Sequence, residues 1–201
     1  MIGVVALGIA AASAKPHYIE AKPNLLTAAY GDDVAGRAFS DELTAKRTSL
    51  IRDSLLPDSG CGAQPDFKLR ATDPYKVGPD DVMWIERYDV VCKHPVQRSL
   101  LVYLKDGALE AVPLLPGSTS ADPTLQVDAS TIVTAAALTR ITKPCEQAAI
   151  ADTALSEAPP QGGGPWKERW TVHTCDETQN IDVNFTPSPE GGTDISVVAT
   201  K

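Results

Sequence analysis

The sequence lacks the motifs of the common catalytic and cofactor-binding sites. Its three histidines, His17, His94 and His173, are scattered, so no H-x-x-x-H or H-E-x-x-H spacing occurs. No serine stands in a G-x-S-x-G elbow, and the glycine run at 162–164 lacks the Lys and Ser/Thr that follow it in a P-loop. We therefore predict no catalytic residues, no cofactor and no metal ligands, and we expect a non-enzymatic protein.

Positive charge is also scarce. The chain has 18 Lys and Arg against 26 Asp and Glu, which gives a net charge of −8 and a pI near 4.8. Binding to a phosphate backbone needs clustered basic side chains that replace its counterions, so a nucleic-acid partner is not predicted. The same acidity is ordinary in a soluble exported protein and identifies no partner.

Long apolar runs are missing apart from one at the N-terminus. Residues 1–14 are apolar and end in Ala12-Ser13-Ala14 before Lys15, which is typical of a signal peptide and its cleavage site, although no Lys or Arg precedes the run. The run is shorter than the roughly 20 residues of a membrane span. We therefore predict a mature chain that starts at Lys15, has no membrane span, and is periplasmic or secreted.

One stretch occurs twice. It reads W-I-E-R-Y-D-V-V-C at 84–92 and W-K-E-R-W-T-V-H-T-C at 166–175. The copies are offset by 82 to 84 residues at four markers: an upstream cysteine, the tryptophan, the second cysteine and a downstream glycine turn. A constant offset of this kind indicates an internal repeat of about 80 residues. We divide the chain into a signal peptide (1–14), an arm (15–36), repeat unit 1 (37–116), a linker (117–126) and repeat unit 2 (127–201).

The cysteines are few and widely spaced. Cys61 and Cys92 are 31 positions apart, Cys145 and Cys175 are 30 apart, and no C-x-x-C pair supports a zinc site. In an exported chain, four such cysteines predict disulfides, with three possible pairings. The repeat favours Cys61–Cys92 and Cys145–Cys175. In the chain-entropy model each bridge would stabilise the fold by roughly 3–4 kcal/mol.

Each unit is predicted to contain one helix followed by four strands. In the first, Ser40 or Asp41 caps a helix that ends before Pro57. In the second, Asp128 or Ser130 caps a helix that continues to Ile141. The arm is expected to be only partly ordered. The predicted strands cover 67–72, 82–92, 98–104, 108–115, 148–155, 166–175, 180–186 and 193–199.

The fold class is therefore α+β, with two tandem units. In each unit one helix packs on an antiparallel β-meander, and one disulfide closes the unit. The sequence does not decide whether the two sheets merge. The extra residue before Cys175, compared with Cys92, predicts a β-bulge at that point.

Alternation along the repeated strand places a glutamate among aromatic side chains. Trp84, Glu86 and Tyr88 share one face, as Trp166, Glu168 and Trp170 do in the second copy. We take the aromatic face to be the buried one, because the opposite face of the second copy is polar. A buried carboxylate needs a partner, so a structural ion pair or backbone hydrogen bonds is one interpretation. The other is a groove between the units, where these six residues bind a cationic or sugar ligand.

The motif of the second unit carries a resemblance. Trp166-x-Glu168-Arg169-Trp170, Cys175 and Gly191-Gly192-Thr193 resemble uncharacterised small exported proteins of Gram-negative bacteria that share W-x-E-x-W…C…GGT. The resemblance covers about 60 C-terminal residues and implies export but no activity. The order of helix and meander also resembles cystatin-like inhibitors in topology alone, and topology does not transfer function.

The combined interpretation is a non-enzymatic binding or envelope-associated module whose partner is an envelope component or a small ligand. The alternative is a hydrolase, or a hydrolase inhibitor, that acts on envelope polymers. Paired carboxylates suit glycoside hydrolysis, but nothing in the sequence sets Glu86 and Glu168 at the separation that this chemistry needs.

Overall fold

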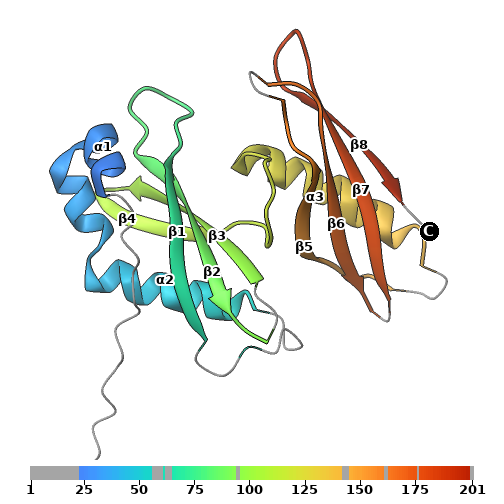
Figure 1. Ribbon diagram of the computed structural model, residues 1–201, viewed down its shortest axis with the longest axis horizontal. Helices are drawn as coiled ribbons and strands as arrows, with labels where there is room; N and C mark the ends of the chain where they lie inside the picture. Colours follow the sequence, from blue (N-terminus) through green and yellow to red (C-terminus); the bar gives the residue numbers. More distant parts are fainter. Residues whose placement is uncertain are drawn as a thin grey trace, which may run out of the picture.

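The chain forms an α+β structure with three helices and two four-stranded antiparallel sheets in the part described here. This computed structural model describes residues 23–55, 61, 65–93, 96–141, 145–160, 163–175 and 177–199. The predicted signal peptide (1–14) and residues 15–22 of the predicted arm lie outside the described residues. Figure 1 shows two separate sheets, with α1 and α2 beside the first and α3 beside the second.

The first half of the chain contains two helices and the first sheet. The sheet follows chain order, β1-β2-β3-β4, with antiparallel neighbours throughout. Asp106 and Gly107 join β3 to β4, and both have positive φ (49° and 79°), as a type I′ hairpin turn requires. The elements are α1 (Pro23–Ala38), α2 (Asp41–Asp53), β1 (Asp66–Pro74), β2 (Met83–Val91), β3 (Val96–Lys105) and β4 (Ala108–Pro113).

Helix α1 corrects the prediction for the arm. The sequence predicts little regular structure over 15–36, but residues from Pro23 onward are helical. The helix is broken at Gly31, whose φ of 84° and ψ of 171° are not helical, so no continuous helical periodicity marks it in the sequence. Its Leu26, Ala35 and Ala38 nevertheless pack in one core cluster with residues of the first sheet. Burial of this apolar surface, rather than local propensity, holds the helix in place.

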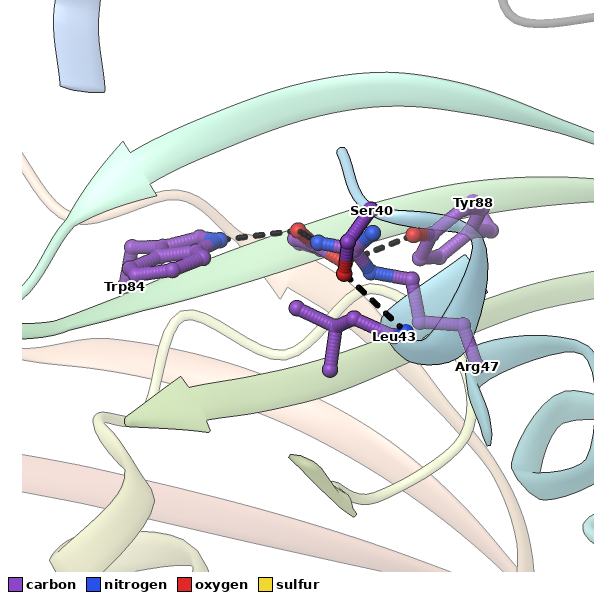
Figure 2. A network of polar contacts seen from close by, with 6 residues as sticks. Ser40, Leu43, Arg47, Trp84 and Tyr88 are labelled. Atoms are coloured by element: carbon purple, nitrogen blue, oxygen red, sulfur yellow. Dashed lines mark hydrogen bonds and ion pairs between the residues drawn. The ribbon is translucent and has the colours of Figure 1, made fainter. Parts of the chain in front are cut away.

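Helix α2 begins where the sequence predicts. Ser40 is its N-cap, and the Ser40 side chain accepts a hydrogen bond from the backbone N–H of Leu43 at 3.3 Å (Figure 2). Leu43, Arg47 and Ile51 follow one another at intervals of four residues and are buried. This spacing places an arginine in the middle of the helix face that packs on the sheet.

The second half contains α3 (Pro123–Leu138), β5 (Ala148–Glu157), β6 (Trp166–Thr174), β7 (Thr178–Pro187) and β8 (Thr193–Ala199), with sheet order β5-β6-β7-β8. Its helix starts earlier than predicted, because the cap is Asp122 and not Asp128 or Ser130. Pro123 occupies the first turn, where its fixed φ favours helix initiation, and Asp122 accepts from Leu125 N–H at 2.9 Å. The last four residues of the predicted linker (123–126) are therefore helical.

Both predicted disulfides are confirmed, whereas the predicted bulge is wrong. The structure pairs Cys61 with Cys92 and Cys145 with Cys175. Strand β6 pairs with β7 without a register shift from Trp166 to His173. The irregularities of this sheet lie between β5 and β6, where β5 carries the extra residues. The extra residue before Cys175, compared with Cys92, therefore does not produce a bulge in β6. The bulges lie in its partner strand β5.

The linker joins the two halves through its backbone. Gly117 N–H donates to Gln97 of β3 at 3.1 Å, and Ser118 N–H donates to Thr153 of β5 at 2.7 Å. The Thr153 hydroxyl donates in turn to the Pro116 carbonyl at 2.6 Å. One short segment therefore bonds to a strand of each sheet.

Gly117 is required at this junction for two reasons. Its φ is +94°, and a Cβ atom there would lie 2.1 Å from the Thr153 carbonyl oxygen. Gly191 has a similar φ of +97° but nothing within 4 Å of its Cβ position, so it offers a matched control. We expect Gly191→Ala to lower the free energy of unfolding by about 1–2 kcal/mol, the cost of the left-handed conformation. Gly117→Ala should cost about 1–3 kcal/mol more, because of overpacking. Urea unfolding of both variants measures the difference, and equal losses would contradict the close approach.

Stability near the junction should depend on the charge of Asp152. Burial raises the pKa of Asp152 above its ordinary value of 3.8, while the backbone N–H of Thr153 and the charge of Arg98 oppose the rise. A raised pKa in the folded state contributes stability below pH 3.8 that is lost as the pH rises through the folded pKa. Wild-type protein should therefore lose stability relative to Asp152→Asn between about pH 3 and about pH 7. Urea midpoints of both proteins across this range measure the difference. A wild type that becomes more stable relative to the variant as the pH rises would contradict the prediction.

Candidate site at the two buried glutamates

The two glutamates of the repeated stretch lie on the core-facing side of the second strand of each sheet. Glu86 on β2 and Glu168 on β6 are both 0% exposed. The W-x-E-x-aromatic motif (84–88 and 166–170) produces this arrangement, because residues two apart on a strand share a face. The burial agrees with the alternation in the sequence, which assigns the aromatic face to the interior.

Glu86 accepts hydrogen bonds from both aromatic residues of its own motif. Trp84 Nε1 donates to Glu86 Oε1 at 2.8 Å, and the Tyr88 hydroxyl donates to Glu86 Oε2 at 2.6 Å. The two donors are thus the residues two positions before and two positions after Glu86 in the sequence. Figure 2 shows the Trp84 and Tyr88 side chains on opposite sides of this network.

A cation from helix α2 completes the first network. Arg47 Nη2 donates to Glu86 Oε1 at 2.5 Å, and the Arg47 side chain is 1% exposed. Its guanidinium also lies over the Phe39 ring, 5.9 Å from the centroid. Removing only one partner of such a buried pair strongly destabilises the folded protein, because the other charge stays in the core without a counterion. Arg47 was not predicted, although its place on an apolar helical stripe with Leu43 and Ile51 was a usable signal.

Glu168 is held by the same geometry with a different third donor. Trp166 Nε1 donates to Glu168 Oε1 at 2.9 Å, and Trp170 Nε1 donates to Glu168 Oε2 at 2.8 Å. The backbone N–H of Ser120, in the segment before α3, donates to Glu168 Oε1 at 2.8 Å. A backbone amide therefore takes the position that Arg47 has in the first network. Ser120 lies in the predicted linker, and its bond to Glu168 was not predicted.

The charged residues of the motif on the opposite face pair across strands. Arg87 bonds to Asp73 on β1, and Arg169 Nε bonds to Asp182 on β7 at 2.8 Å. These pairs are partly exposed, where an ion pair is typically worth under about 1 kcal/mol. They are accessory to the fold, whereas the glutamate on the other face lies in its core.

The carboxylates are enclosed, and their oxygens are engaged. Burying an isolated carboxylate costs several kcal/mol, while hydrogen bonds to a charged group contribute about 1.5–3 kcal/mol each. Three donors therefore offset the cost in each network. Trp84, Tyr88 and Trp170 are also buried, and Trp166 is half-buried and stacks on Phe185 with ring centroids 4.7 Å apart.

The six residues predicted to form a ligand groove thus come together as two triads. Each triad faces the core of its own sheet, and in the first sheet Trp84 and Tyr88 belong to two neighbouring core clusters. This burial favours the structural interpretation, because a ligand could reach either carboxylate only if the aromatic donors moved away.

Comparison with protein-family models, with curated proteins and with solved structures finds no match to the chain. Among the described residues, no helix is long and apolar enough to cross a membrane. The same residues contain no group of three or more His, Cys, Asp or Glu side chains that could hold a metal ion.

The second network predicts a specific coupling between Glu168 and Trp170. In Glu168→Gln one carboxylate oxygen becomes an amide NH₂. If the Gln carbonyl oxygen still accepts the hydrogen bonds of Trp166 and Ser120, this NH₂ group faces the Trp170 indole N–H. Two opposed donors should cost about 1–3 kcal/mol of unfolding free energy. Trp170→Phe removes one donor, so the double variant should be more stable than the sum of the single losses predicts. Strict additivity in urea unfolding would contradict the contact.

The first network predicts non-additivity of a different origin. Arg47→Met should cost about 3–5 kcal/mol, because it leaves the Glu86 charge in the core without its cation. Combining it with Glu86→Gln removes both charges and should recover at least about 1 kcal/mol relative to the sum of the single losses. Lys46→Met, on the adjacent and more exposed position that pairs with Glu110, is the matched control. It should cost under about 1 kcal/mol.

Proposed function

We propose that the chain is an exported, non-enzymatic binding or envelope-associated module built from two related units. Each unit would have a helix packed on an antiparallel meander, a glutamate on the second strand held by aromatic donors, and one disulfide. The single observation that carries the proposal is that both carboxylates are enclosed and hydrogen-bonded within the protein. Residues committed to the architecture in this way are not available to substrates.

Three parallels between the halves support common descent. The two sheets share one strand order, the glutamate lies on the second strand of each, and each half has its own disulfide. The first half differs in having two helices, because α1 precedes the element that corresponds to α3. Helix followed by meander is also the order on which we based the topological comparison with cystatin-like inhibitors, and it supplies no activity.

Export is supported by the disulfides and by the apolar N-terminal run. Disulfides persist in oxidising compartments such as the periplasm and are rare in the cytosol. Residues 1–14 have the length and the small-x-small ending of a cleavable signal. A binding role then falls to the outer surface of the two units, where an exported module with a net charge of −8 meets other envelope components.

The experiment that tests this function combines processing with binding. Expressed in a Gram-negative bacterium, the chain should reach the periplasm, start at Lys15 and contain no free thiol, as N-terminal sequencing and alkylation would report. The purified mature protein should co-sediment with peptidoglycan sacculi. Retention in the cytoplasm would contradict export, and failure to sediment would contradict association with this polymer.

Two substitutions separate surface binding from the ligand groove. Glu86→Gln and Glu168→Gln change groups that are buried in the fold, so variants that stay folded should sediment as the wild type does. Loss of sedimentation by a folded variant would support the groove instead. Loss of folding by both variants would support the structural role of the carboxylates.

A further inference from the structure

We propose that the Cys145–Cys175 disulfide is a thiol-exchange site for small thiols without negative charge, whereas Cys61–Cys92 is a permanent bridge. The two disulfides close loops of nearly equal length, with sequence separations of 30 and 31 residues. Their surroundings differ, however, in access and in packing. These differences predict which bridge opens first and which of its sulfurs is attacked.

Access favours the second bridge. Cys175 is exposed just beyond the end of β6. Beside it lies an open depression of about 420 Å³, which residues 146–149 and 173–175 line. An attacking thiolate must approach a disulfide sulfur directly, so the rate of exchange depends on this kind of access. A small thiol fits the depression, and Cys175 is the cysteine that lines it.

Hydrogen bonding gives the exchange a direction. The backbone N–H of Cys175 donates to Cys145 Sγ at 3.1 Å. An N–H group aimed at a sulfur stabilises negative charge on it, which makes that sulfur the better leaving group. The Gln147 carbonyl oxygen also lies 3.1 Å from Cys145 Sγ, where it can accept the proton of the departed thiol. Access to Cys175 and these two backbone contacts favour attack on Cys175 and departure of Cys145.

The step balances without another reactant. The incoming thiolate forms a bond to Cys175 Sγ while the Cys145–Cys175 bond breaks, and Cys145 leaves as a thiolate that takes a proton from water. A second molecule of the same thiol then attacks the sulfur of the bound small thiol, and Cys175 leaves as a thiolate that takes a proton from water. This second step releases the oxidised small-molecule disulfide and leaves two reduced cysteines. The thiol is the reductant, and the protein disulfide is the oxidant.

Packing protects the first bridge. Cys92 lies against the core cluster of Ile51, Leu69, Tyr88, Val90 and Leu100. The half-buried Phe67 and Leu55 pack against the same cluster. Apolar packing of this kind limits approach to the sulfur and disfavours a thiolate there.

Charge in the depression selects among thiols. Glu146 is an exposed residue in its wall. Its carboxylate repels an anionic thiol and attracts a cationic one, over distances that salt screens. Cysteamine should therefore react faster than thioglycolate, and Glu146→Gln should reduce this preference at the second bridge.

The test uses the folded full-length chain with both disulfides intact. Protein is treated with increasing cysteamine without denaturant, quenched with iodoacetamide, and mapped by mass spectrometry. We expect Cys145 to be alkylated and Cys175 to carry cysteamine at concentrations that leave Cys61–Cys92 at least ten times less opened. In denaturant, where the folded surroundings are lost, the two bridges should open at rates within about threefold of each other.

Three results would overturn the proposal. Opening of Cys61–Cys92 first, or of both bridges together in the folded protein, would contradict the selective site. Cysteamine on Cys145 with Cys175 alkylated would contradict the direction of attack. A preference for cysteamine over thioglycolate that is unchanged in Glu146→Gln would contradict the role of the carboxylate.

Discussion

The rest of the structure depends on a carboxylate buried between two aromatic hydrogen-bond donors of its own strand. Because side chains two residues apart share a face, the spacing W-x-E-x-W or W-x-E-x-Y brings three large residues into one core with their polar atoms already paired. The third donor comes from outside the strand. Arg47 of α2 supplies it in the first half, and Ser120 of the segment before α3 supplies it in the second. Each glutamate therefore connects its sheet to the segment that covers it.

The two halves meet the same electrostatic requirement with different chemistry. The first balances the Glu86 charge with a buried guanidinium, whose Nε and Nη1 have no hydrogen-bond partner in the part of the chain described. The second uses three neutral N–H donors. The first solution concentrates stability in one ion pair, whereas the second ties Glu168 to the backbone that leads from the inter-sheet junction into α3. The same W-x-E-x-aromatic motif is thus completed by different third donors in the two halves.

Patterns in the sequence correctly predicted the buried face of the repeated strand, the start of α2 and the disulfide pairing. Alternation placed the two glutamates on the buried face, Ser40 marked the start of α2, and the duplicated cysteines gave the correct pairing. The third donor to each carboxylate comes from a distant segment and was not predicted. Arg47 and Ser120 reach their carboxylates across 39 and 48 positions, and α1 is stabilised by packing despite its break at Gly31. The early start of α3 at Pro123 was visible locally but competed with other capping residues.

The most direct measurement follows the indole N–H groups, because each of the three tryptophans donates to a glutamate. Hydrogen exchange of the Trp side chains by NMR, on the wild type and on the two Glu→Gln variants, reads these bonds individually. We expect three protected indole signals in the wild type, with Trp84 affected only by Glu86→Gln, and Trp166 and Trp170 only by Glu168→Gln. Indole protons that exchange freely in the folded wild type, or that do not respond to either substitution, would contradict it.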